Sequence, residues 1–230
     1  MHRYNWIGTM NTRDLGFTPT ANGEHIIFQR FIRSDAPCKI TDNVKDFLLE
    51  INVKTIIDLR NENIAQRSPN AFMYDGKFLC YNFPLAVNTK VPNSENDVIE
   101  NYCNMLENEI AIPSIFKTMA NSTGGVLFHC QEGKDRTGLI SAILLLLAGV
   151  PDIDIFADYE ISNVYLYEMV KIARSIPNGI PDHLLYVKPE YMEAVLAYLK
   201  ERYGAVENYL LAKNVSDNEI DRLKKKLLNK

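Results

Sequence analysis

The segment from Gly125 to Gly149 constrains the fold of this chain more than any other stretch. It opens with the short apolar run Val126–Phe128, continues through a polar loop that contains Gly133, and becomes a long apolar stretch from Thr137 onward. A short apolar run between polar residues is typical of a buried strand, and a long apolar stretch that ends at a glycine is typical of a helix. The sequence therefore predicts a strand, a loop and a helix in direct succession.

The polar loop combines a cysteine with an arginine at the start of the predicted helix. Cys130 and Arg136 stand six positions apart, and the other three cysteines have no arginine at that spacing. The first N–H groups of a helix have no partner inside the helix, and together with the helix dipole and a guanidinium they bind anions such as phosphate. The same field favours a thiolate, which is a nucleophile for phosphoryl transfer. The loop is thus a candidate site for phosphate chemistry.

Related loops occur in other kinds of protein. A nucleotide-binding loop would explain Gly133–Lys134, but it requires glycine at position 128 and serine or threonine at position 135, where this chain has Phe128 and Asp135. A sulfur-transfer enzyme also holds a cysteine in an anion-binding loop, and a phosphate-binding module without turnover would use the same cradle. These last two stay open as alternatives to a phosphatase.

The ten residues from His129 to Gly138 resemble the signature loop of the cysteine-dependent tyrosine phosphatases. The variant with Gly-Lys-Asp-Arg-Thr is similar to a bacterial branch that includes secreted mycobacterial and listerial virulence phosphatases, which act on phosphotyrosine and in several cases on phosphoinositides. Two departures stand out: Phe17 replaces an expected glycine, and Glu132 stands where a small residue is usual. Shorter matches extend the resemblance over most of the chain: Asn11, Arg13–Gly16, Arg33–Ser34, Asp58–Arg60, Tyr159 and Ser162–Asn163.

This resemblance implies a protein-tyrosine-phosphatase-like hydrolase that needs no metal and no other cofactor. Cys130 is then the nucleophile that forms a phosphocysteine, and Arg136 holds phosphate oxygens. Asp135 is the general acid that the related branch uses, with Asp58 as the alternative acid. The other residues expected to contact phosphate lie in the same loop: Gln131, Glu132, Gly133, Lys134 and Thr137.

Three further polar residues are candidates for the same cleft. Asp58 and Arg60 end a predicted strand, and ligands of open α/β sheets sit beyond the carboxyl ends of strands. The alternative is a salt bridge between these two residues that fixes the strand end. His129 is expected to order the loop, with a buried core histidine as the alternative.

The substrate class also has two alternatives. Lys134 adds positive charge suited to phosphoinositides, whereas the charge of Glu132 opposes a headgroup that carries several phosphates. We expect phosphotyrosine in a protein, or another small phosphomonoester, to be the better substrate, with phosphoinositide or dual-specificity activity as the alternative. If Glu132 faces solvent or pairs with Lys134, its effect on this choice should be small.

Length and composition limit the domain organisation, the binding partners and the location of the protein. The 230 residues, 47% hydrophobic and 23% charged, suit one phosphatase domain over 1–230. A net charge of −4 argues against nucleic-acid binding, and the four scattered cysteines lack metal-ligand spacing. No secretory signal opens the chain, and the longest apolar run, Leu139–Val150, is shorter than the roughly 20 residues of a membrane helix. We therefore expect a cytoplasmic protein without stable membrane insertion.

Hydrophobic patterns elsewhere predict further strands and helices. Besides 126–128, strands are expected at 53–59 and 79–85, with one or two within 26–33. Strands separated by helices imply an α/β fold. The resemblance adds a mostly parallel, tyrosine-phosphatase-like sheet of about four or five strands, with helices on both faces and a helix-rich C-terminal third. Helices are expected over 41–51, 95–108, 112–121, 137–149, 152–175 in one broken or two pieces, 189–203 and from 216 onward.

Overall fold

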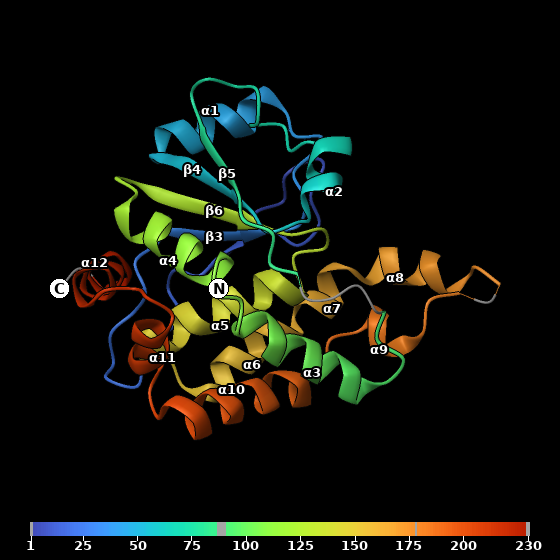
Figure 1. Ribbon diagram of the computed structural model, residues 1–230. Coiled ribbons are helices and arrows are strands. Elements are labelled where there is room, and N and C mark those ends of the chain that lie inside the picture. Colours follow the sequence, from blue (N-terminus) through green and yellow to red (C-terminus); the bar gives the residue numbers. More distant parts are fainter. Residues whose placement is uncertain (1, 87–90, 178, 229–230) are drawn as a thin grey trace.

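A six-stranded sheet runs through the computed structural model, which describes residues 2–86, 91–177 and 179–228 (Figure 1). The strand order is β1-β2-β3-β6-β4-β5, in which the last four strands are parallel and the first two pair antiparallel at one edge. The α/β class and the mostly parallel sheet are therefore confirmed. The count exceeds the expected four or five because β1 and β2 have only two residues each, too few to show a sequence period. The strands are β1 (His2–Arg3), β2 (Arg13–Asp14), β3 (Phe31–Ser34), β4 (Val53–Asp58), β5 (Leu79–Asn82) and β6 (Gly125–His129).

The central strand β6 is buried along its whole length, as expected for a parallel strand covered on both faces. It lies between β3 and β4, and its last residue, His129, is in register with both Ser34 and Asp58. The carboxyl ends of three neighbouring strands therefore meet at one level of the sheet. That edge is where the predicted loop leaves β6.

Helices cover both faces of the sheet, as the resemblance implied (Figure 1). On one face, Ile32, Ile56 and Leu127 pack with helix α1, and on the other their chain neighbours Phe31, Ile57 and Phe128 join a larger core with α4 and α5. This alternation follows from the two-residue period of a strand. The helices are α1 (Asp42–Glu50), α2 (Glu62–Arg67), α3 (Glu95–Leu106), α4 (Ala111–Asn121), α5 (Asp135–Leu147), α6 (Asp152–Glu160), α7 (Ser162–Tyr165), α8 (Tyr167–Arg174), α9 (Asp182–Leu185), α10 (Pro189–Tyr203), α11 (Val206–Ala212) and α12 (Asp217–Leu228).

The helix behind the loop, α5, is buried on almost every side, so its apolar run is a core helix rather than a membrane segment. It ends where Gly149 adopts a φ of +76°, a conformation that a glycine takes without steric cost. Across the described residues, no helix combines the length and the apolar content that a bilayer crossing needs. The predicted helix over 152–175 is divided into three pieces, α6, α7 and α8.

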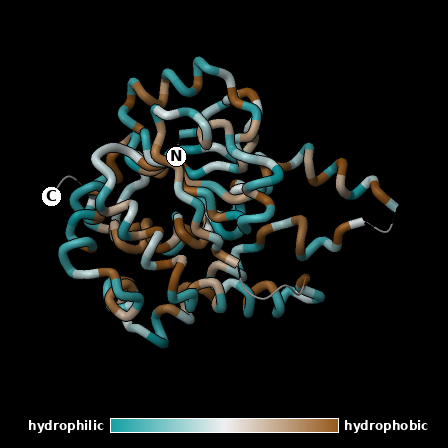
Figure 2. The backbone as a smooth tube through the Cα atoms, turned by 45° about the horizontal axis from the view of Figure 1, so that its top comes forward, coloured by the Kyte–Doolittle hydropathy of each residue, from teal (hydrophilic) through white to brown (hydrophobic). Residues whose placement is uncertain are grey.

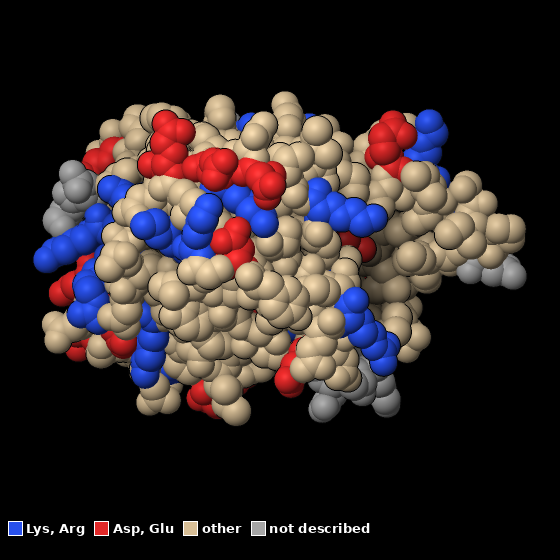
Figure 3. All heavy atoms as spheres, turned by 90° about the horizontal axis from the view of Figure 1, so that it is seen from above, with Lys and Arg blue, Asp and Glu red and all other residues tan. Residues whose placement is uncertain are grey.

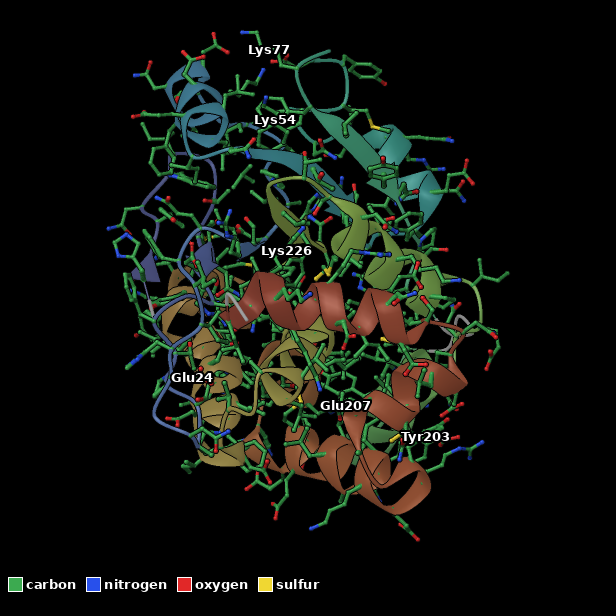
Figure 4. The ribbon with its side chains drawn as sticks, turned by 90° about the vertical axis from the view of Figure 1, so that its left-hand side faces the viewer. Glu24, Lys54, Lys77, Tyr203, Glu207 and Lys226 are labelled. Carbon is green, nitrogen blue, oxygen red and sulfur yellow. The ribbon has the colours of Figure 1, made fainter. Side chains whose placement is uncertain are left out.

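The last helix, α12, is fastened to the body by its basic side chains. Lys226 points from α12 to the end of α4, where its Nζ donates to the carbonyl oxygens of Met119 at 2.8 Å and Ser122 at 2.6 Å (Figure 4). A cation at this position also complements the helix dipole. Burial lowers the pKa of Lys226 to about 8.

The surface carries charges of both signs. On the face that holds α1, basic and acidic side chains are interspersed (Figure 3), and Lys45 lies 3.4 Å from the carboxylate of Asp75. Helix α8 and the described residues that follow it project from the body as an arm (Figure 1), along which hydrophobic and hydrophilic segments alternate (Figure 2). The inner side of this arm, including Val170, packs in a small apolar cluster with Leu185.

Candidate active site

The loop from Cys130 to Lys134 joins β6 directly to α5, as the sequence predicted. The Cys130 side chain is buried at the end of the strand. Gly133 has a φ of +69°, and a Cβ atom there would lie 2.6 Å from the carbonyl group of Ser34 and from the backbone nitrogen of Asp35. Glycine is therefore required at this position, because the loop packs directly against the end of β3.

The loop is held in shape by hydrogen bonds to its carbonyl groups. Every carbonyl oxygen from residue 129 to residue 134 accepts a bond of 2.7–3.1 Å from the protein around it. The backbone N–H groups of residues 131–136, in contrast, have no acceptor among the described residues. Carbonyls held outward leave the N–H groups free for an anion. The donors to the six carbonyls are, in order, Leu59 N, His129 Nδ1, Ala36 N, Asn11 Nδ2, Arg33 Nη2 and Gly138 N.

A buried network of two arginines and one aspartate supports the loop through its Gly133 carbonyl. Arg33 donates to the Gly133 carbonyl at 2.7 Å and to the carboxylate of Asp158, which also accepts from Arg13 at 2.8 Å. Burial and the neighbouring charge of Arg13 lower the pKa of Arg33 to about 10, so it remains a cation at neutral pH. Burial alone would raise the pKa of Asp158, but the two arginines hold it below its usual value.

Asp58, Arg60 and His129 lie behind the loop rather than along the cleft. Arg60 grips the Asp58 carboxylate with its Nη2 at 2.6 Å and its Nε at 2.9 Å, and both side chains are buried. Burial would raise the pKa of Asp58, but the hydrogen bonds from Arg60 hold it below its usual value. His129 is buried with a lowered pKa, so it is neutral and donates from Nδ1 to the Cys130 carbonyl at 3.0 Å. The charges of Asp58 and Arg60 are thus satisfied within the protein.

A cleft of about 420 Å³ opens beside Asp135 and Arg136. Arg136 is half-buried, and its one hydrogen bond to a described residue is a long one, 3.4 Å to the Leu59 carbonyl. Its guanidinium therefore keeps most of its donors for a ligand. The cleft is otherwise lined mainly by apolar side chains: Asn61, Ile64, Leu85, Ala86, Val91, Pro92, Val98, Asn101, Tyr102, Met105, His183 and Leu184.

The remaining loop residues differ in their surroundings. Lys134 is buried, and its Nζ donates to the carbonyls of Leu184 and Leu185 and lies 3.2 Å from the Glu132 carboxylate. Gln131 is exposed. Thr137 has a buried hydroxyl without a hydrogen-bond partner among the described residues. Glu132 and Lys134 therefore form a pair with each other, one of the arrangements left open by the sequence.

Sequence reasoning missed two groups that touch this site. Asp158 stands on the buried side of α6, and a charged residue on an apolar helix face is the signal that could have revealed it. Tyr102 donates a hydrogen bond to Asp135 from α3, and its position gave no such signal because tyrosines are common in cores.

The departure from the family pattern at Phe17 places a residue with a side chain in an unfavourable backbone conformation. Its φ is +62°, a region that favours the glycine expected there.

A cysteine in an anion-binding loop between a central parallel strand and a buried helix defines the class of cysteine-dependent phosphatases. The model of the tyrosine phosphatase family matches residues 4–229, so the chain belongs to that family and is a phosphatase. A tyrosine-protein phosphatase from Nostoc commune is 32% identical over 230 residues, covering 91% of this chain and 78% of the relative.

Two other proteins are similar to this chain. A triple specificity protein phosphatase, PtpB of Mycobacterium tuberculosis, is 30% identical over 120 residues, which are 45% of this chain and 44% of the relative. The crystal structure of TpbA from P. aeruginosa has a TM-score of 0.43 and 15% identity, covering 84% of this chain and 91% of TpbA.

Proposed function

We propose that the protein hydrolyses phosphomonoesters through a phosphocysteine at Cys130, and that phosphotyrosine in proteins is its main substrate class. The observation that carries this proposal is that the carbonyls of residues 129–134 all accept hydrogen bonds from the protein, while the N–H groups of residues 131–136 face no acceptor among the described residues. Such a cradle is complementary to the equatorial oxygens of a phosphoryl group in transfer. We assign this activity to residues 1–230 as one catalytic domain.

In the first step, the Cys130 thiolate attacks phosphorus in line with the leaving oxygen. The S–P bond forms as the P–O bond of the ester breaks, while Arg136 and the loop N–H groups hold the three remaining oxygens. Thr137, whose buried hydroxyl has no partner among the described residues, supplies a hydrogen bond to the thiolate. In the second step, water attacks phosphorus and the S–P bond breaks, which releases phosphate and restores the thiolate.

Asp135 is the general acid in this scheme, because it lines the cleft next to Arg136. Asp58, the alternative, is buried and held as a carboxylate by Arg60. A carboxylate with a lowered pKa and no access to the cleft is a poor proton donor at neutral pH.

The cleft favours a substrate with one phosphate on an apolar or aromatic group. Arg136 is the only arginine or lysine among its described lining residues, and most of the others are apolar. Lys134, which could have bound a second phosphate, is engaged by Glu132 and two carbonyls. A phosphotyrosine side chain matches this surface. A multiply phosphorylated inositol would have only one cation, Arg136, to neutralise its several phosphates. Phosphoinositide monophosphates are the second candidate, because the bacterial branch that the loop resembles includes enzymes that act on phosphoinositides.

Release of phosphate from para-nitrophenyl phosphate in the presence of a metal chelator tests the activity directly. Wild-type protein should turn over, and Cys130→Ser should lose activity by about 10⁴-fold or more while still binding vanadate. A wild type that binds vanadate without turnover would indicate a silent phosphate-binding module. Thiosulfate turnover without ester hydrolysis would indicate sulfur transfer, and normal activity of the variant would exclude the phosphocysteine.

A further inference from the structure

Two buried tyrosines stand behind the candidate acid in a chain of hydrogen bonds. The hydroxyl of Tyr102, on α3, donates to Oδ1 of Asp135, and the hydroxyl of Tyr159, on α6, lies 2.8 Å from that of Tyr102. Because a phenol has one hydrogen, and Tyr102 gives its hydrogen to the carboxylate, Tyr159 is the donor in the second bond. The chain therefore runs from Tyr159 through Tyr102 to Asp135.

We propose that Tyr102, supported by Tyr159, is a positioning residue that holds Asp135 in the orientation from which it protonates the leaving group. The proposal rests on the function proposed above, in which Asp135 is the acid. Because Tyr102 occupies Oδ1, the transferable proton is carried by Oδ2. The phenol thus fixes both the rotamer of the carboxyl group and the oxygen that faces the substrate.

The packing around the two rings makes this orientation rigid. The Tyr102 ring meets Tyr159 and Tyr191 edge-on, each with ring centroids 6.4 Å apart. A Cβ atom at Gly138 would lie 3.0 Å from the Tyr159 ring. The glycine at this position therefore lets the ring pack directly against the backbone of α5. Burial and the charge of Asp135 raise the pKa of both Tyr102 and Tyr159 well above the usual value. Both phenols therefore remain protonated donors at neutral pH.

The proton balance assigns no transfer to the tyrosines themselves. As the P–O bond of the ester breaks, the proton on Oδ2 of Asp135 moves to the leaving oxygen, and Tyr102 stabilises the resulting carboxylate through Oδ1. When water attacks the phosphocysteine, Oδ2 takes one of its protons and the acid is restored. Tyr102 keeps its hydrogen throughout, which distinguishes positioning from proton relay.

Tyr102→Phe, Tyr159→Phe and Tyr191→Phe form a matched set for the test. Each variant loses one hydroxyl, but the buried hydroxyl of Tyr191 has no hydrogen-bond partner among the described residues, so this variant is the control. We would measure kcat/KM, which reports the step in which the leaving group departs, on aryl phosphates whose phenols span several units of pKa. Tyr102→Phe should lower kcat/KM about 10-fold on the poorest leaving groups and by less than about threefold on nitrophenyl phosphate, because only a basic leaving group needs the acid.

Tyr159→Phe should show the same dependence on the leaving group, with a loss of activity of about threefold on the poorest leaving groups. Tyr191→Phe should show no loss of activity on any substrate of the series. In an Asp135→Asn background, Tyr102→Phe should add no further loss. If Tyr102→Phe does not fold, Tyr159→Phe alone and in the same background gives the same readout.

Three results would overturn the proposal. An equal loss on all leaving groups would assign Tyr102 a structural role, and a further loss in the Asp135→Asn background would show that it acts through another group. If Asp135→Asn itself shows no dependence on the leaving group, the acid assigned under the proposed function is wrong, and the role of Tyr102 falls with it. The first two results leave that assignment intact.

Discussion

Two acid and arginine pairs lie near the ends of neighbouring strands, and they differ in how their charges are used. Asp58 and Arg60, at the end of β4, are buried and bonded to each other through two short contacts. Asp135 and Arg136, just beyond β6, are half-buried and line the cleft. The same residue types thus stabilise the fold in one place and remain available for a ligand in the other.

The spacing of each pair explains the difference. Residues two apart at a strand end lie on the same side, so Arg60 can reach back to Asp58. Asp135 and Arg136 are adjacent in the first turn of α5, and adjacent helical residues do not face each other. The helix therefore prevents the acid and the cation of the site from neutralising each other. The experiments below would break or sharpen this contrast.

The largest effect is expected for Arg136→Ala. Loss of the guanidinium removes the principal positive charge from the cradle, so kcat/KM should fall by about 10³-fold with little change in the unfolding midpoint. Arg174→Ala, which removes an exposed arginine of the arm paired with Asp182, should leave kcat/KM unchanged. A loss of less than tenfold for Arg136→Ala would mean that the backbone cradle alone carries the charge stabilisation.

Asp58→Asn should act on stability rather than on chemistry. It leaves Arg60 buried without a counter-ion, which should lower the free energy of unfolding by about 3 kcal/mol, while kcat of the folded enzyme changes little. The pKa of Asp58 is lowered in the folded state, so its pair stabilises the protein above the unfolded pKa of about 4 and loses that effect as the pH falls further. Urea unfolding at pH 7 and pH 3 should show a smaller difference between wild type and variant at pH 3.

Asp135→Asn should lower kcat/KM by about 10²-fold on phenyl phosphate and much less on substrates with acidic phenols. The reason is that a good leaving group departs without a proton. Stability should be unchanged, in contrast to Asp58→Asn. An equal loss across the substrate series, or the same dependence in Asp58→Asn, would reverse the roles of the two aspartates.

The smallest effect is expected for Glu132→Ala. Its carboxylate pairs with Lys134 at the rim of the loop, and an ion pair with one partly exposed partner is weak. The ratio of turnover on a phosphotyrosyl peptide to turnover on a phosphoinositide monophosphate should change by less than about twofold. A tenfold shift toward the lipid would show that Glu132 faces the substrate and selects against it.

The strand, loop and helix around Cys130 could be predicted because their signals are local. The apolar run of β6 and the start of α5 were placed within two residues, and the end of β4 within one. The last helix was also predicted correctly, and the Glu219 carboxylate accepts from the backbone N–H and the hydroxyl of Ser216, which is one half of a capping box. Each of these features depends on residues a few positions apart.

The parts of the site that could not be predicted depend on contacts between distant segments. Asp158 reaches Arg13 across 145 positions and Arg33 across 125, and Tyr102 reaches Asp135 across 33. Only the folded chain shows that Lys134 is tied to the carbonyls of Leu184 and Leu185. The sequence therefore identified which charged residues lie in or near the site, but it did not show which of these charges are neutralised by a partner.

The outward bonding of the six loop carbonyls has one further consequence. A cradle shaped by its own scaffold is ready before any ester arrives. In the proposed mechanism its N–H groups bind only phosphoryl oxygens. Free orthophosphate presents the same oxygens, so each turnover leaves a competitor in the place that the next substrate must occupy. The enzyme should therefore be inhibited by its own product. The concentration of free phosphate around it then determines the fraction of enzyme molecules that can bind substrate.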